Sequence, residues 1–309
     1  LQGCEIMKIV FMGTPEFSVP ILEALNERYE IVLVISQPNK LKKKGQWVDT
    51  PVAATAKRLA LPLYQPEKVG ADVEYIKSFQ SDVLVTAAFG QYIPSKVLAL
   101  FKKTMNVHGS LLPKYRGGAP IQRSIMNGDK TTGITIIEMA KKLDAGIMYA
   151  KRECPILESD TSSTMFEKLS LVGRDLLLEV IEDIFNGTLT GEVQNEEEVT
   201  YAPNLTPEEE IIDFNRPAKD IVHQIMGLSL DPGATILVKD TKLKVFRAKV
   251  IPDTTASKPG TVLSLKKQVL IKALDDAVSL DLILVPGKKM LPAKDFVNGQ
   301  KILKEFDVI

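Results

Sequence analysis

The chain has few of the residues that build disulfide frameworks and metal clusters. Its 309 residues include two cysteines, Cys4 and Cys154, and two histidines, His108 and His223. Disulfide-rich folds and zinc clusters need several such residues at short spacings, so the sequence excludes both kinds of site. Sparse cysteine is also typical of a reducing compartment. We therefore expect no metal and a cytoplasmic location.

Long apolar runs and an excess of one charge are missing as well. No stretch reaches the ~18 apolar residues of a membrane-spanning helix, and no targeting segment is visible, so we expect no membrane partner. The 39 basic residues balance 39 acidic ones, and this total gives no sign of a nucleic-acid partner. Residues 211–309 are mildly basic, however, with 16 basic residues against 11 acidic ones. Such a segment fits weak attraction to a polyanion, and equally an ordinary lysine-bearing surface.

Short apolar runs alternate with helical segments in the first half of the chain. Residues 8–12, 31–35 and 82–88 have the length and composition of buried strands. Thr14 follows the first run and is suited to cap a helix. This order predicts parallel strand–helix–strand units, and therefore an α/β fold with a Rossmann-like open, mostly parallel sheet and flanking helices. Gly13 lacks the later glycines of a dinucleotide-binding loop, which argues against that kind of site.

The second half of the chain has a different pattern. A polar, acidic connector is followed by five short apolar runs separated by turn residues, at 235–238, 243–248, 260–265, 269–273 and 278–285. Several short strands with turn signals predict a small β-barrel. We therefore expect a catalytic domain at 7–188, a linker at 189–210 and a C-terminal domain at 211–309. We also expect Met7 to be the native start.

One stretch, residues 104–120, carries the pattern of a reactive site. Asn106 and His108 are two apart, so on a strand both side chains point to the same face. Histidine changes charge near neutral pH, and an amide can donate to a developing oxyanion. A glycine-rich turn follows, in which backbone groups are accessible to a ligand. An isolated Asn-x-His is more often the end of a strand with a hydrogen-bonded histidine. The pair alone therefore does not distinguish a reactive site from a structural one.

The longer motif is more specific. Asn-Val-His-Gly-Ser-Leu-Leu-Pro, followed by Arg-Gly-x-Ala-Pro-Ile-Gln, closely resembles the signature of the folate-dependent formyltransferases. In that family the Asn, the His and a downstream Asp carry catalysis, which implies Asn106, His108 and Asp144. The resemblance also implies folate contacts from two loops, made by Phe89, Gly90, Ile93, Gly109, Ser110, Leu111, Leu112 and Pro113.

The opening Gly-Thr-Pro-Glu-Phe at 13–17 resembles the branch of this family that formylates initiator methionyl-tRNA. That resemblance implies an OB-like C-terminal barrel that helps to hold tRNA. It also implies tRNA contacts from a basic loop and from the glycine-rich turn, made by Lys40, Lys42, Lys43, Lys44 and Arg116. A lysine run is otherwise an ordinary solvated loop. The chain departs from the branch's usual residues at several positions, among them Asn39, Lys142, Ala145, Ile147, Asn204 and Met226.

The resemblance implies transfer of a formyl group from 10-formyltetrahydrofolate to the α-amino group of methionyl-tRNA for translation initiation, by a monomer that needs no metal. Asp144 would accept the proton of the amine, directly or through water, or hold His108 protonated; both roles stay open. The alternatives are a sugar-nucleotide N-formyltransferase with the same trio and a non-catalytic tRNA- or folate-binding protein. Steep salt dependence of binding would distinguish tRNA from a sugar nucleotide.

Overall fold

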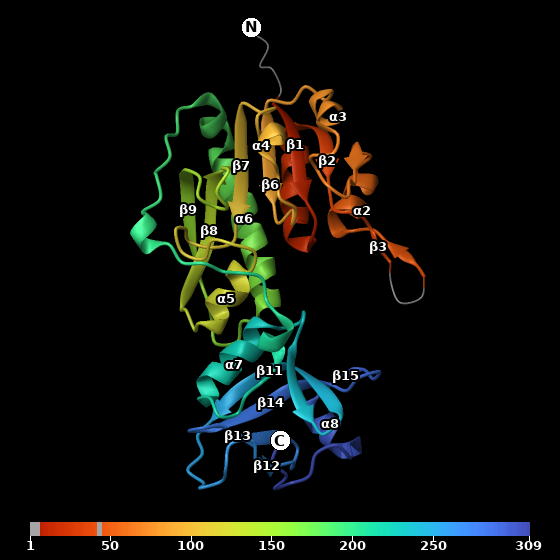
Figure 1. The fold of residues 1–309 in the computed structure, drawn as a ribbon, viewed down its shortest axis with the longest axis vertical. Coiled ribbons are helices and arrows are strands. Elements are labelled where there is room, and N and C mark those ends of the chain that lie inside the picture. Colours follow the sequence, from red (N-terminus) through yellow and green to blue (C-terminus); the bar gives the residue numbers. More distant parts are fainter. Residues whose placement is uncertain (1–6, 42–44) are drawn as a thin grey trace. The chain divides into compact units, whose positions relative to one another are not determined.

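The structure is a computed structural model that describes residues 7–41 and 45–309 (Figure 1). It divides into two compact units. The first unit contains the chain up to Pro120, Thr131–Pro155 and Phe166–Ala202, and the second contains Ile121–Lys130, Ile156–Met165 and Pro203–Ile309. Cys4 and three residues of the predicted tRNA-binding loop, Lys42, Lys43 and Lys44, lie outside the described residues.

The first unit is built on a seven-stranded sheet with the order β5-β2-β1-β6-β7-β8-β9. Its first five strands in this order pair in parallel, and β8 and β9 pair antiparallel at one edge. The predicted open, mostly parallel sheet is therefore confirmed. The strands are β1 (Lys8–Gly13), β2 (Glu30–Ile35), β5 (Leu63–Tyr64), β6 (Val83–Ala87), β7 (Lys103–His108), β8 (Thr131–Glu138) and β9 (Met148–Pro155).

Helices and short elements surround this sheet (Figure 1). They are the 3-10 turns η1 (Glu16–Ser18) and η2 (Glu196–Glu198), the helices α1 (Val19–Arg28), α2 (Pro51–Arg58), α3 (Val73–Lys77), α4 (Ser95–Leu98) and α6 (Ser162–Asn186), and the hairpin strands β3 (Lys40–Leu41) and β4 (Trp47–Val48). Helix α6 packs closely on β7 at Gly173, where a Cβ atom would lie 2.6 Å from Val107 Cγ1. None of the described helices is long and apolar enough to cross a membrane.

The expected helix cap at Thr14 is wrong. A 3-10 turn begins at Glu16, and α1 starts only at Val19. The Thr14 hydroxyl instead donates a 2.8 Å hydrogen bond to the carbonyl of Phe89, in the loop that follows β6. A tertiary hydrogen bond has replaced the local one, and it joins the loops that follow β1 and β6.

The second unit contains an antiparallel sheet with the order β10-β11-β14-β13-β12, to which β15 adds beside β14. Its strands are β10 (Ala234–Val238), β11 (Thr241–Ile251), β12 (Val262–Ser264), β13 (Val269–Lys272), β14 (Ala277–Leu284) and β15 (Met290–Pro292). Its other elements are α5 (Pro120–Met126), η3 (Pro207–Glu210), α7 (Ala218–Gly227) and α8 (Ala293–Gly299). The predicted strand-rich unit is confirmed, although β10 and β12 do not pair, so the described strands form a partial barrel.

The second unit encloses a buried charge. The ammonium group of Lys272 lies 2.8 Å from the Asp253 carboxylate and 2.8 Å from the carbonyl of Asp275. The two charged side chains are only 6% and 12% exposed. The hydrogen bond from Lys272 is the main reason that the pKa of Asp253 lies below its usual value. Removing one partner of such a pair leaves the other charge buried without compensation.

Asp253→Ala is expected to lower the free energy of unfolding of the second unit by about 3 kcal/mol at pH 7. Hydrogen exchange of the amides of β13 measures this change. Lys249→Ala, which removes the exposed partner of Asp281 in the same unit, is the control and should change stability by less than about 0.5 kcal/mol.

The same pair has a pH dependence with a defined sign. The pKa of Asp253 is lowered by folding, so its contribution is complete above the unfolded pKa of about 3.9. It is lost as the pH falls through the depressed folded pKa. The difference in the free energy of unfolding between wild type and Asp253→Ala should therefore narrow as the pH falls below about 3.9. A difference that stays constant on this acidification would contradict the charge pairing.

Candidate active site

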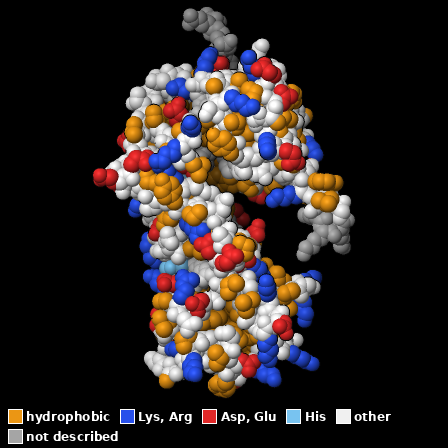
Figure 2. Space-filling view, in the orientation of Figure 1, with side chains coloured by type: hydrophobic (Ala, Val, Ile, Leu, Met, Phe, Trp, Pro, Cys, Tyr) orange, Lys and Arg blue, Asp and Glu red, His pale blue; other side chains and the backbone are white. Residues whose placement is uncertain are grey.

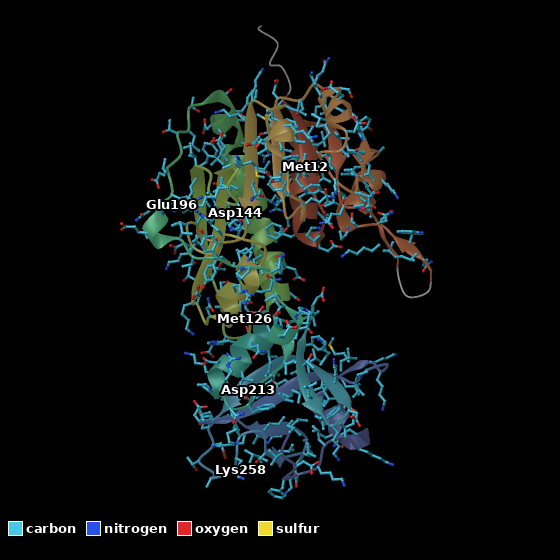
Figure 3. All side chains as sticks on the ribbon, in the orientation of Figure 1. Met12, Met126, Asp144, Glu196, Asp213 and Lys258 are labelled. Carbon is cyan, nitrogen blue, oxygen red and sulfur yellow. The ribbon has the colours of Figure 1, made fainter. Side chains whose placement is uncertain are left out.

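Two chain segments bring the predicted catalytic side chains together in the first unit. Asn106 and His108 lie at the end of β7. Asp144 lies in the turn between β8 and β9 (Figure 3). The Nδ1 atom of His108 is 3.7 Å from Oδ2 of Asp144. Both side chains are largely buried, at 6% and 11% exposure, so their interaction is weakly screened by solvent.

The ring of His108 has a fixed orientation. Its Nε2 atom lies 3.0 Å from the carbonyl oxygen of Tyr115. A carbonyl oxygen only accepts, so Nε2 carries the proton and donates. Nδ1 is then the nitrogen that faces the Asp144 carboxylate. This arrangement suits an imidazolium, which donates from both nitrogens.

The amide of Asn106 is oriented by a neighbouring strand. The hydroxyl of Thr86, on β6, lies 2.8 Å from Oδ1 of Asn106 and donates to it. Parallel pairing of β6 with β7 places the two residues opposite each other. Because the amide oxygen is occupied, the Nδ2 group remains available to donate to a ligand.

Asp144 is held in an unfavourable backbone conformation. Its φ angle is +49°, in the left-handed region that side chains other than glycine rarely adopt. The N–H group of Gly117 donates a 2.9 Å hydrogen bond to its Oδ2 atom. The amide of Gln194 donates a 2.7 Å hydrogen bond to its carbonyl oxygen. These contacts from distant segments fix the turn, and a strained residue of this kind is typical of functional sites.

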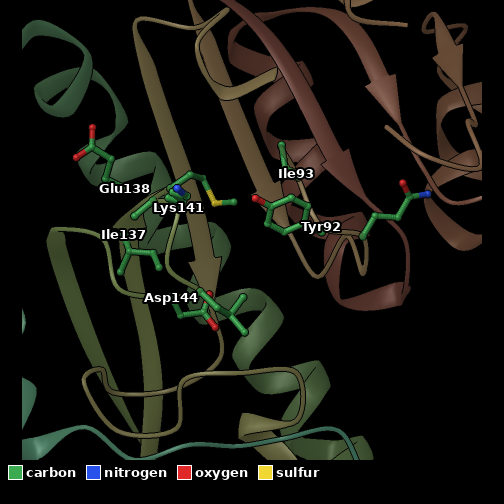
Figure 4. A pocket seen from close by; sticks show the side chains of 10 residues that line it. Tyr92, Ile93, Ile137, Glu138, Lys141 and Asp144 are labelled. Atoms are coloured by element: carbon green, nitrogen blue, oxygen red, sulfur yellow. The ribbon is translucent and has the colours of Figure 1, made fainter. Parts of the chain in front are cut away.

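A recess lies beside Asp144 (Figure 4). Gln91, Tyr92 and Ile93 form one wall, and the end of β8 with its turn forms the other, from Ile137 to Lys141 with Leu143 and Asp144. Tyr92 is 71% exposed and Leu143 is 66% exposed. Large apolar side chains at an open recess are suited to bind a flat aromatic ligand.

The predicted folate contacts divide into those at this recess and those elsewhere. Ile93 lines it, whereas Tyr92 and Leu143 were missed because an exposed apolar residue in a loop has no distinctive sequence signal. Phe89 is buried, and its carbonyl accepts from Thr14 and Gln37. Gly90, which follows, has a φ angle of +81°.

The turn at Gly109, Ser110, Leu111, Leu112 and Pro113 is packed into the protein through its side chains. Ser110 is fully buried, and its hydroxyl donates to the carbonyl of Lys114. Thr135 on β8 donates to the carbonyl of Ser110 and accepts from the N–H of Leu112. Leu112 packs against Ile137 and Met148. The side chains of Ser110 and Leu112 are therefore structural, and Thr135 is a supporting residue that the sequence did not indicate.

Arg116 does not lie where a tRNA contact requires it. The residue is 1% exposed, and its Nε and Nη2 groups donate to Gln194 and Glu196 at 2.9 and 2.8 Å. The hydrogen bond from Arg116, followed by that from Lys142, lowers the pKa of Glu196 to about 2. A buried, paired guanidinium is not presented to a phosphate backbone, so we correct the interpretation of Arg116. Lys40, at the start of β3, is exposed.

Candidate metal ligands do not cluster anywhere in residues 7–41 and 45–309: no group of three or more His, Cys, Asp or Glu side chains could hold an ion. Acidic and basic side chains are interspersed on the face shown in Figure 2.

Sequence comparisons cover nearly the whole chain. The sequence model described as formyl transferase matches residues 7–181, and the model of the formyl transferase C-terminal domain matches residues 204–301. A methionyl-tRNA formyltransferase of Lactobacillus johnsonii is 43% identical over 94% of this chain and 95% of its own. Those of Latilactobacillus sakei and Lactococcus lactis are 45% and 43% identical, over 94% and 96% of this chain and of their own lengths.

Solved structures share the fold at lower identity. HypX from Aquifex aeolicus in complex with tetrahydrofolic acid is 20% identical, with a TM-score of 0.66 over 98% of this chain and 50% of its own, so this chain spans about half of HypX. An N-formyltransferase from Helicobacter canadensis is 18% identical, with a TM-score of 0.68 over 89% of this chain and 99% of its own. Methionyl-tRNA formyltransferase from Clostridium thermocellum is 16% identical, with a TM-score of 0.57 over 91% of this chain and 99% of its own.

The fold agrees with these structures, and the sequence matches extend over both compact units. The chain belongs to the formyl transferase family.

Proposed function

We propose that the chain transfers the formyl group of 10-formyltetrahydrofolate to the α-amino group of initiator methionyl-tRNA. The observation that carries this proposal is the paired arrangement of His108 and Asp144 at 3.7 Å, beside the oriented amide of Asn106. The acceptor is inferred from relatives of this name that match 94% of the chain at about 43% identity. The product, N-formylmethionyl-tRNA, would serve translation initiation.

The oxyanion would be stabilised by two donors. When the amine attacks the formyl carbon, negative charge develops on the carbonyl oxygen. Nδ2 of Asn106 and Nδ1–H of His108 are the donors left available by their partners Thr86 and Tyr115. Losing one donor of this kind typically reduces the rate by about 10²–10³. The carbon–nitrogen bond to the folate N10 atom then breaks, and N10 takes up a proton.

The attacking nitrogen becomes cationic and must lose a proton. Asp144 serves both roles that the sequence left open, one with each oxygen. Oδ2 faces His108 and stabilises the imidazolium by its charge. Oδ1 accepts no hydrogen bond from any described residue and is the oxygen that takes the proton, directly or through water.

The folate ring system would lie in the recess between Tyr92 and Leu143, with its reactive end toward Asp144. The turn at 109–113 would contribute backbone groups. Lys40 and its neighbours Lys42, Lys43 and Lys44 would contact the tRNA backbone, and the C-terminal domain at 211–309 would help to hold it. We further propose that the protein is a cytoplasmic monomer, in which a catalytic domain at 7–188 and a linker at 189–210 act together with this C-terminal domain.

Formyl transfer to three acceptors tests the proposal: initiator methionyl-tRNA, uncharged tRNA and an amino-sugar nucleotide. We expect product on methionyl-tRNA alone. His108→Ala should fold normally and lose turnover by at least about 10², because it removes an oxyanion donor. Product on the amino sugar alone would instead favour a sugar N-formyltransferase, whose solved examples share this fold. Near-normal activity of His108→Ala would contradict the assignment of the site.

Thr86→Val tests the orientation of Asn106. Valine keeps the shape of threonine but cannot donate to Oδ1, so the amide can rotate away from the oxyanion. We expect kcat to fall by about 10-fold, less than the 10²–10³ for removing a donor outright. Thr132→Val is the matched control, since this buried β8 hydroxyl has no hydrogen-bond partner among the described residues. Equal kcat in the two variants would show that Thr86 does not orient the amide.

A further inference from the structure

The segment at 192–202 is more than a connection between two parts of the chain. It runs beside the turn that follows β7 and exchanges backbone hydrogen bonds with it. The N–H of Arg116 donates to the carbonyl of Thr200 at 2.9 Å, and the N–H of Ala202 donates to the carbonyl of Arg116 at 2.7 Å. The hydroxyl of Thr200 also accepts from the N–H of Tyr115. The residue whose carbonyl holds His108 is therefore itself held by this segment.

The side chain of Gln194 joins this segment to the Asp144 turn. Gln194 is 5% exposed, and both ends of its amide are engaged. Nε2 donates to the carbonyl oxygens of Asp144 and Gly146 at 2.7 and 2.8 Å. Oε1 accepts from Nε of Arg116 at 2.9 Å. A single amide thus connects the buried guanidinium with the backbone on both sides of Ala145.

The residue that follows Arg116 holds Asp144 by a second route. The N–H of the next residue, Gly117, donates to Oδ2 of Asp144. A Cβ atom at Gly117 would lie 2.5 Å from the carbonyl oxygen of Ala202, so the segment fits closely against this position. The carboxylate and the backbone of Asp144 are therefore both fixed by atoms that belong to, or touch, Arg116 and its neighbour.

Stability alone is a poor explanation for Arg116. Its side chain is fully buried, and Nη1 has no hydrogen-bond partner among the described residues. A buried donor without a partner is unfavourable. The charge is balanced by the Glu196 carboxylate, which lies 2.8 Å from Nη2 of Arg116. The chain maintains a buried ion here at some cost, and what that ion holds is the Asp144 turn.

We propose that Gln194 and Arg116 are positioning residues that fix Asp144 against His108. This inference rests on the proposed function, because it assigns a role within that catalytic site. Neither side chain touches the recess. They act through the Asp144 backbone, which would otherwise relax from its left-handed conformation and move the carboxylate away from His108.

Gln194→Met tests the proposal. Methionine keeps the length of the side chain but removes both donors and the acceptor. We expect kcat to fall by about 10- to 100-fold, because a displacement of about 1 Å in a catalytic group has an effect of this size. The KM values for both substrates should stay within about twofold of wild type, since Gln194 contacts neither.

Gln224→Met in α7 is a matched control. The Gln224 amide is also buried, donates to two backbone carbonyls (Glu209 and Ile211) and accepts from an arginine, Arg216. Gln224→Met should lower the melting temperature about as much as Gln194→Met does, because each loses comparable buried hydrogen bonds. It should leave kcat within about twofold of wild type. A second variant, Gln194→Glu, keeps the acceptor for Arg116 and replaces the donors to the Asp144 turn with a carboxylate oxygen, which cannot donate. It should lose kcat as Gln194→Met does, and it preserves the ion pair if methionine prevents folding.

The kcat values of the Gln194 variants decide whether Gln194 positions Asp144. A selective loss of kcat in both variants supports the proposal. A kcat within about twofold of wild type in the folded Gln194→Glu variant overturns it, as does an equal kcat loss in Gln224→Met. Wild-type protein is assayed first. If wild type transfers formyl to neither methionyl-tRNA nor the amino-sugar nucleotide, the proposed function fails and the positioning role fails with it. If wild type is active and the Gln194 variants are equally active, only the positioning role fails.

Discussion

The carboxylate of Asp144 must face His108, and the local chain does not favour this. The residue has a left-handed backbone, in a turn without a regular element of its own. Its position depends on the hydrogen bond from Gly117 to Oδ2 and on the bond from Gln194 to its carbonyl. Both donors come from segments that are distant in sequence. The geometry of the trio is therefore a tertiary property, which the sheet and the connector create together.

The sheet supplies the other half of the site. Parallel pairing of β6 with β7 sets Thr86 opposite Asn106, and the antiparallel pairing of β7 with β8 sets Thr135 opposite His108. The Thr86 hydroxyl orients the amide of Asn106, and the Thr135 hydroxyl holds the turn after β7. Polar side chains are costly on buried strands unless they are hydrogen-bonded. Here the bonds orient groups that the proposed reaction needs, so the residues that stabilise the sheet also prepare the site.

The sequence predicted those features that local pattern determines. Apolar runs located the buried strands, and the resemblance pointed to Asn106, His108 and Asp144, whose catalytic roles remain proposals. The sequence did not identify Gln194, because an amide in an acidic connector has no pattern that points to a carbonyl fifty positions away. The predicted tRNA contact of Arg116 assumed an exposed side chain, which is usual for arginine. At Thr14 the expected cap was wrong because a hydrogen bond to Phe89 competes with the local one.

The proposed mechanism requires that His108 presents Nδ1, and not Nε2, to the reacting atoms. The chain contains two histidines, so nitrogen NMR of histidine-labelled protein gives two resolvable rings. Burial lowers the pKa of the other, His223, below its usual value, which helps to separate the signals. We expect a proton on Nε2 of His108 in the folded protein, because the Tyr115 carbonyl requires a donor. A ring protonated at Nδ1 alone would contradict it.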